Sequence, residues 1–203
     1  MSFNKFRKAR FCKFQHLNTR RGFTLLEVLV AIAVFGLIAA GTAGAFASMQ
    51  QAWRKQRNTM DLAQNSRWAM EFTVNELRHA TAAAAPAWAR AQIQAGGRRI
   101  QFGRDADGDN DVDGSDIQIQ IERPAGPNTI FRRRQRTGGA GAWGAWQELA
   151  NFIVFPNPSG NNIFIDSGGG LYTIELTVRP QPAQAAGREN RNYTLRTRVR
   201  VRN

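Results

Sequence analysis

The chain has 203 residues, with 28 lysines and arginines against 15 acidic residues, and a formal net charge of +13 at pH 7. One cysteine and two histidines exclude an internal disulfide and leave little for a zinc–thiolate or histidine-based catalytic site. Gly168–Gly170 lacks the lysine and the serine or threonine of a P-loop, so we expect no enzyme. The composition predicts one membrane anchor and one globular domain.

The N-terminus joins a basic segment to a long apolar one. Residues 1–22 carry seven basic residues and no acid, and no charged residue stands between Val28 and Trp53. As a helix, residues 23–46 would span a hydrocarbon core of about 30 Å. The positive-inside rule then keeps the basic segment cytoplasmic and predicts a periplasmic C-terminal domain.

Glu27 stands at the start of this apolar run. A carboxylate near the membrane core costs about 2.5–3.5 kcal/mol on insertion scales, which indicates a cationic partner. The alternative is that Glu27 lies among the lipid headgroups of an ordinary anchor.

The run Arg20-Arg21-Gly22-Phe23-Thr24-Leu25-Leu26-Glu27 resembles the class III leader of type IV pilins and of the pseudopilins of type II secretion. The resemblance implies that a prepilin peptidase cuts after Gly22 at the bacterial inner membrane and that Phe23 becomes an N-methylated N-terminus. It also implies that Glu27 pairs with the N-terminal amine of a neighbouring subunit during filament assembly. Loss of the leader would remove Cys12 and leave 21 basic against 15 acidic residues, a net charge of +6.

Residues 47–80 predict an amphipathic continuation of the helix. Apolar residues recur there at spacings of three, four or seven and form one stripe, which we expect to pack beneath a sheet: Trp53, Met60, Ala63, Met70, Val74 and Leu77. Other residues of the segment are similar to W-type minor pilins and J-type minor pseudopilins: Gln64, Arg67, Ala69, Leu77, Arg78 and Ala80. Residues 82–86 should end the helix, because proline disfavours helical geometry in the preceding residue.

The remainder, residues 81–203, predicts a β-rich globular domain. Alternating apolar residues indicate strands around 100–102, 117–121, 130–131, 152–155, 163–165, 172–178 and 195–201, with loops at 138–144 and 156–160. A long helix followed by strands predicts an α+β fold, in which the helix lies under an antiparallel sheet as in pilins.

Residues 105–116 place six carboxylates between two predicted strands. They match the ligand spacing of an EF-hand calcium loop: Asp105, Asp107, Asp109, Asp111 through its carbonyl, Asp113 and Asp116. The loop also resembles those of dockerin modules, with Val112 at position 8, but position 6 is Asn110 where glycine is usual. We favour calcium over a polar hairpin connection, because a divalent ion satisfies six mutually repelling charges together.

The C-terminus carries alternating arginines: Arg196, Arg198, Arg200 and Arg202. In a strand they share one face, opposite Thr197, Val199 and Val201. Arg132–Arg134 and Arg136 would extend this face if their strand were adjacent. The face can meet DNA phosphates, an acidic neighbour in a filament, or solvent.

These features predict a minor pilin or pseudopilin that initiates or caps a type IV pilus or a type II secretion pseudopilus. Its expected partners are other pilin-like subunits, prepilin peptidase and the inner membrane. The alternative is a membrane-tethered calcium-dependent or DNA-binding module that serves adhesion or DNA uptake.

Overall fold

The computed structural model describes residues 22–80, 86–109, 111–127, 129–188 and 190–201. The expected leader up to Arg21, the helix end at 82–85, and both Asn110 and Arg202 lie outside the described residues. Contacts divide the chain into two compact units, Met1–Gln50 and Gln51–Asn203.

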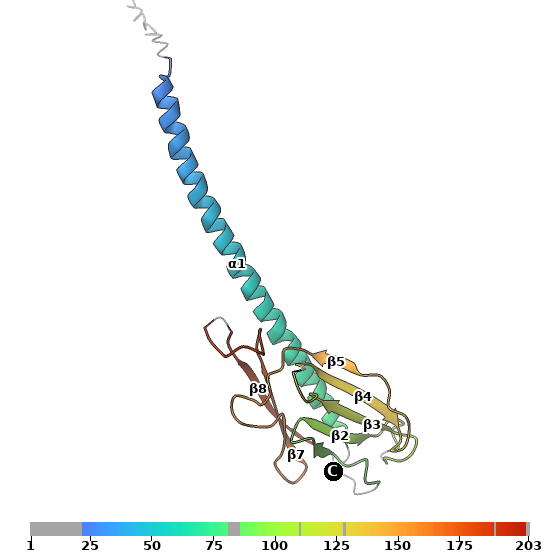
Figure 1. Cartoon of the computed structure of the whole chain (residues 1–203). Helices are drawn as coiled ribbons and strands as arrows, with labels where there is room; N and C mark the ends of the chain where they lie inside the picture. Colours follow the sequence, from blue (N-terminus) through green and yellow to red (C-terminus); the bar gives the residue numbers. More distant parts are fainter. Residues whose placement is uncertain (1–21, 81–85, 110, 128, 189, 202–203) are drawn as a thin grey trace, which may run out of the picture. The chain divides into compact units, whose positions relative to one another are not determined.

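One helix and eight strands make up the described structure (Figure 1). In chain order they are α1 (Leu25–Arg78), β1 (Gln92–Gln94), β2 (Arg99–Arg104), β3 (Ile117–Glu122), β4 (Phe131–Thr137), β5 (Gln147–Ala150), β6 (Phe164–Asp166), β7 (Leu171–Val178) and β8 (Tyr193–Arg200). The predicted α+β class is confirmed.

Only the last part of α1 has a buried face. That face begins at Leu62, continues through Ala69, Met70 and Leu77, and includes the polar residue Thr73. The expected stripe is therefore wrong in its first half: the side chains of Trp53 and Met60 are 65% and 55% exposed. The helix meets the strands only beyond Asp61, so the earlier apolar positions have no sheet to pack against.

Five strands form one antiparallel sheet in the order β1-β2-β3-β4-β5. Ile100 pairs with Ile121 and Phe102 with Ile119, which places the apolar residues of β2 and β3 on the core face. Strands β1 and β5 were not predicted from the sequence. Both are short and rich in glutamine or glutamate, so they lack the apolar alternation that marked the other strands.

The remaining strands form a second antiparallel sheet, β6-β7-β8. The prediction of a strand at 152–155 is wrong. Ile153 makes a single bridge to Val178, and Phe152 has φ +63°, which interrupts an extended backbone.

Gly97 lies in the β1–β2 turn, where that turn meets the second sheet. Its φ is +76°, and a Cβ at this position would come within 2.2 Å of Asn162, so the position requires glycine.

Both sheets and the end of α1 share one hydrophobic core. The rings of Phe131 and Phe164, one from each sheet, stack with centroids 6.1 Å apart. Glu76 of α1 is buried between the two guanidinium groups of Arg104 and Arg133, at 3.1 and 3.2 Å. Figure 1 shows the end of α1 beside strands of both sheets.

Candidate functional site

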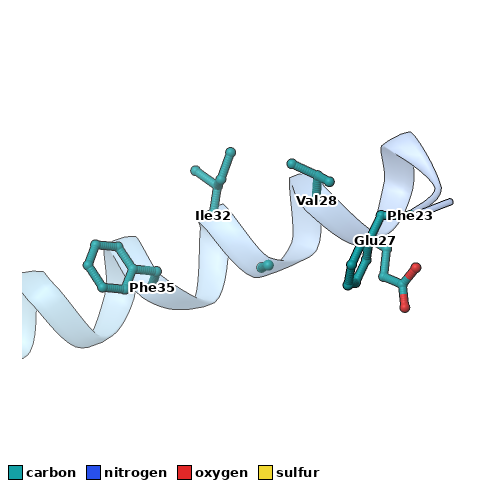
Figure 2. Close-up of a pocket in the computed structure, with 6 residues that line it drawn as sticks. Phe23, Glu27, Val28, Ile32 and Phe35 are labelled. Carbon is teal, nitrogen blue, oxygen red and sulfur yellow. The ribbon is translucent and has the colours of Figure 1, made fainter.

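The start of α1 holds the residues that the leader resemblance singled out. The backbone N–H of Glu27 donates to the carbonyl and the hydroxyl oxygens of Thr24, at 3.0 and 3.3 Å, so Thr24 caps the helix. Glu27 thus lies in the first turn, where the helix dipole favours a negative charge. Figure 2 shows its carboxylate projecting from the helix beside the Phe23 ring.

Large apolar side chains around Glu27 are exposed along the same helix. Phe23 is 82% exposed, and Leu25, Ile32 and Phe35 are exposed as well. By length and composition α1 is the one helix in the described structure that could cross a membrane. The surface around Glu27 suits lipid or another apolar helix, and Glu27 is its one charged group between Phe23 and Trp53.

The Asp-rich loop 105–116 joins β2 to β3, as expected. It brings three of the six predicted ligands together, because carboxylate oxygens of Asp105, Asp107 and Asp109 lie within 4.8 Å of one another. The Asp105 carboxylate accepts the Gly108 N–H at 2.6 Å, and that of Asp109 accepts the Asp111 N–H at 2.8 Å.

Asp113 and Asp116 bind the loop's own backbone. The buried carboxylate of Asp116 accepts N–H groups from Ala106 at 2.6 Å and Asp113 at 2.8 Å, one on each oxygen. Asp113 accepts both the N–H and the hydroxyl of Ser115 at 2.7 Å. These two carboxylates shape the loop, while those of Asp105, Asp107 and Asp109 are gathered together.

Electrostatics distinguishes two of these carboxylates. The hydrogen bond from the Asp111 N–H lowers the pKa of Asp109, but desolvation and the charges of Asp107, Asp105 and Asp111 together raise it above its ordinary value. Hydrogen bonds from Ser115 lower the pKa of Asp113. The carboxylate of Asp109 is therefore repelled by its acidic neighbours, and a bound cation would relieve this repulsion.

Those of the C-terminal arginines that the structure describes lie as predicted on one exposed face of β8. Arg196, Arg198 and Arg200 are exposed, while Val199 faces the core. Arg196 approaches Glu175 of β7 at 3.8 Å. Arg132–Arg134 and Arg136 do not extend this face, because β4 is not adjacent to β8 and pairs instead with β3 and β5 in the other sheet.

The outer face of β4 instead carries a ladder of its own. Arg132, Arg134 and Arg136 donate to the side chains of their cross-strand partners Glu122, Gln120 and Gln118. Trp146 lies against Arg132 and Arg134, with guanidinium-to-ring distances of 3.9 and 4.3 Å, and Trp143 lies 4.5 Å from both Arg134 and Arg136. This ladder was not predicted, although arginine alternates along β4 and glutamine along β3 in the sequence.

Comparison with known proteins adds two findings. Residues 17–43, which include Gly22, Phe23 and Glu27, match the family described as the prokaryotic N-terminal methylation motif. Type II secretion system protein I of Pseudomonas aeruginosa is 35% identical over 83 residues, or 40% of this chain and 60% of that protein. The chain thus spans less than two thirds of the length of this curated relative, and no solved structure matches it.

The methylation motif coincides with the capped, lipid-compatible start of α1, and the relative belongs to a type II secretion system. The narrower likeness to W-type minor pilins or J-type pseudopilins stays a prediction, since the matched relative is protein I. The chain therefore combines a prokaryotic N-terminal methylation motif at the head of one long helix with a pilin-like α+β architecture, and part of it is similar to a type II secretion protein.

Proposed function

We propose that the protein is a minor pilin or pseudopilin, made as an inner-membrane precursor, cut by prepilin peptidase after Gly22 and methylated on Phe23. The observation that carries this proposal is the methylation motif, which covers both residues directly ahead of the capped apolar helix. The second unit, Gln51–Asn203, is called the globular unit below. It then lies on the periplasmic side, as the basic residues before Gly22 imply.

Assembly follows from the exposed start of α1. Apolar side chains surround Glu27, and the new N-terminal amine of a neighbouring subunit is the cation that satisfies it. The protein joins other pilin-like subunits through this helix and initiates or caps the filament, without catalysing a reaction. The similarity to a type II secretion protein favours a pseudopilus over a type IV pilus.

The test is the intact mass and N-terminal sequence of the full chain expressed with and without an active prepilin peptidase. We expect a chain that begins at Phe23 and carries one added methyl group, and an uncut chain for Gly22→Ala. Cleavage at another bond, or equal cleavage of Gly22→Ala, contradicts the proposal.

The second candidate function is calcium binding by the loop. It is supported by the three gathered carboxylates of Asp105, Asp107 and Asp109 and by the raised pKa of Asp109. We propose that these three side chains hold a calcium ion, with Asp113 and Asp116 fixing the loop around it. A cation there would hold the first half of the β2–β3 connection together.

Binding to the folded state alone raises stability by RT ln(1 + [L]/Kd), about 2.7 kcal/mol at a hundredfold excess over Kd. Calcium should therefore raise Tm of the wild type, and less so for Asp105→Ala and Asp109→Ala. Glu71→Ala, an exposed carboxylate on α1, should keep the full calcium effect. Equal Tm values with calcium and with chelator would leave only a polar hairpin connection.

We propose that the exposed arginines of β8 bind an acidic surface on a neighbouring subunit. Their alternation on one open strand face supports a broad electrostatic contact. Nucleic acid offers the same chemistry, and no described feature favours it over a protein.

A further inference from the structure

A hollow of about 320 Å³ lies beside α1 in the globular unit. One side comes from the helix and the other from the chain after β5 and after β7. The residues that line it include Asn58, Asp61, Asn65, Asn151, Phe152 and Pro180. None of them belongs to the helix start, the Asp-rich loop or the basic face of β8.

Phe152 is the most unusual residue of this hollow. Its backbone has φ +63°, a region that bulky side chains rarely adopt. Among the described residues that follow α1, it is the one large apolar side chain that is exposed, at 42%. The backbone is fixed on both sides, since Phe152 accepts the Arg179 N–H at 3.1 Å and Ile153 donates to Thr129 at 2.8 Å. The fold thus holds an aromatic ring in the open at the cost of backbone strain, which is a mark of functional sites.

Helix α1 adds a row of polar groups opposite the ring. Asn58, Asp61 and Asn65 are spaced by three and four residues and so share one helix face. All three are exposed, and in the described part of the chain none makes a side-chain hydrogen bond or an ion pair. They offer a carboxylate and two amide carbonyls as hydrogen-bond acceptors to a ligand.

The residues that line the hollow include one carboxylate and no basic side chain, although the chain as a whole is basic. Asp61 contributes one carboxylate. Glu148 brings a second one close by, because it accepts a hydrogen bond from the lining residue Asn151 at 2.7 Å. The nearby guanidinium of Arg179 donates to the carbonyl of Pro182 at 2.7 Å.

We propose that this hollow binds an arginine side chain presented by a protein partner. A guanidinium has five N–H donors in a planar fork, which can serve the Asp61 carboxylate and the carbonyls of Asn58 and Asn65 together. Its flat face stacks on an aromatic ring, and Phe152 supplies one with Pro180 beside it. Arginine that enters such a pocket is a typical anchor of protein interfaces.

Lysine and neutral sugars are the competing occupants. An ammonium has three donors and a compact charge, so it would leave part of the acceptor row without a partner. A sugar would stack on the ring and donate hydroxyl hydrogen bonds to the amides and to Asp61, but it carries no positive charge to balance that carboxylate.

The experiment is a titration of the full-length protein in detergent micelles with asparagine labelled in ¹⁵N. The probe is Nα-acetyl-arginine amide, compared with its neutral analogue Nα-acetyl-citrulline amide, with Nα-acetyl-lysine amide and with methyl glucoside. We expect the arginine probe to shift the side-chain signals of Asn58, Asn65 and Asn151, and to bind about tenfold more tightly than citrulline. Equal binding of citrulline or lysine, or a response to methyl glucoside alone, overturns the proposal.

Two variants and a control separate binding from folding. Asp61→Asn should lower the arginine affinity to that of citrulline, whereas Glu71→Gln, an exposed carboxylate on the same helix, should leave it unchanged. Phe152→Gly should abolish binding and keep or raise Tm, because glycine adopts positive φ without strain. A large fall in Tm for Phe152→Gly would show that the ring serves packing instead. Processing at Gly22 is independent of all three variants, so this proposal can fail while the proposed function stands.

Discussion

Glu122 shows how a single buried charge is kept stable in this protein. Its side chain is 4% exposed and receives Arg132 at 2.6 Å and Arg99 at 2.6 Å. Burial raises the pKa of Glu122, but the hydrogen bonds and charges of Arg132 and Arg99 outweigh it and leave the pKa below its ordinary value. The charged form of Glu122 is therefore the one that the folded state favours.

A pH dependence follows at this residue. Because the folded pKa is lower than the unfolded value of about 4.3, Glu122 contributes stability above that pH and loses it as the pH falls through the folded pKa. The free energy of unfolding of Glu122→Gln should be lower than that of the wild type at pH 7, and the gap should shrink below about pH 4. Denaturant unfolding at both pH values measures it, and a gap that is constant with pH contradicts the account.

The elements are joined by polar contacts as much as by apolar ones. Helix α1 meets the five-stranded sheet through Glu76, whose two oxygens face Arg104 of β2 and Arg133 of β4. The side chain of Arg133 is 8% exposed, so water solvates its charge only weakly. Breaking a buried pair by removing one partner costs about 3–5 kcal/mol.

Glu76→Gln should therefore destabilise the globular unit by about that amount, measured by denaturant unfolding. The matched control is Glu71→Gln, one turn earlier on the exposed side of the same helix, which should change stability by less than about 0.5 kcal/mol. A similar small effect for both variants would show that the Glu76 network contributes little.

At the scale of the whole molecule, the hydrophobic core belongs to one unit. The earliest buried core residue in the described structure is Leu62, and the large apolar side chains from Phe23 to Trp53 are all exposed. The described part of the first unit, Met1–Gln50, therefore exposes an apolar surface that lipid or another apolar helix would cover.

Removal of residues 1–50 tests this division. The remaining unit, Gln51–Asn203, should be soluble without detergent and unfold cooperatively, with Tm within a few degrees of that of the full chain in detergent. Thermal circular dichroism provides the measurement. A non-cooperative transition would show that the first unit contributes to the core of the second.

Several parts of this protein were accessible from sequence because their signals are local. The methylation motif occupies consecutive residues, the apolar run has the length of a bilayer, and β2, β3, β7 and β8 alternate with period two. The Asp-rich connection between β2 and β3 was equally visible. What was predicted wrongly, the strand at 152–155 and the early helix stripe, depended on neighbours that are remote in sequence.

By itself, then, the sequence determined the α+β class, the motif at the helix start and the candidate ligands of the loop. Tertiary structure alone decided that the strands divide into two sheets, that Arg132–Arg136 stand apart from the arginines of β8, and that Asn58 and Asp61 share a hollow with Phe152. The physical reason is that strand pairing and side-chain burial join residues that are far apart in the chain, and no local period records which of them will meet.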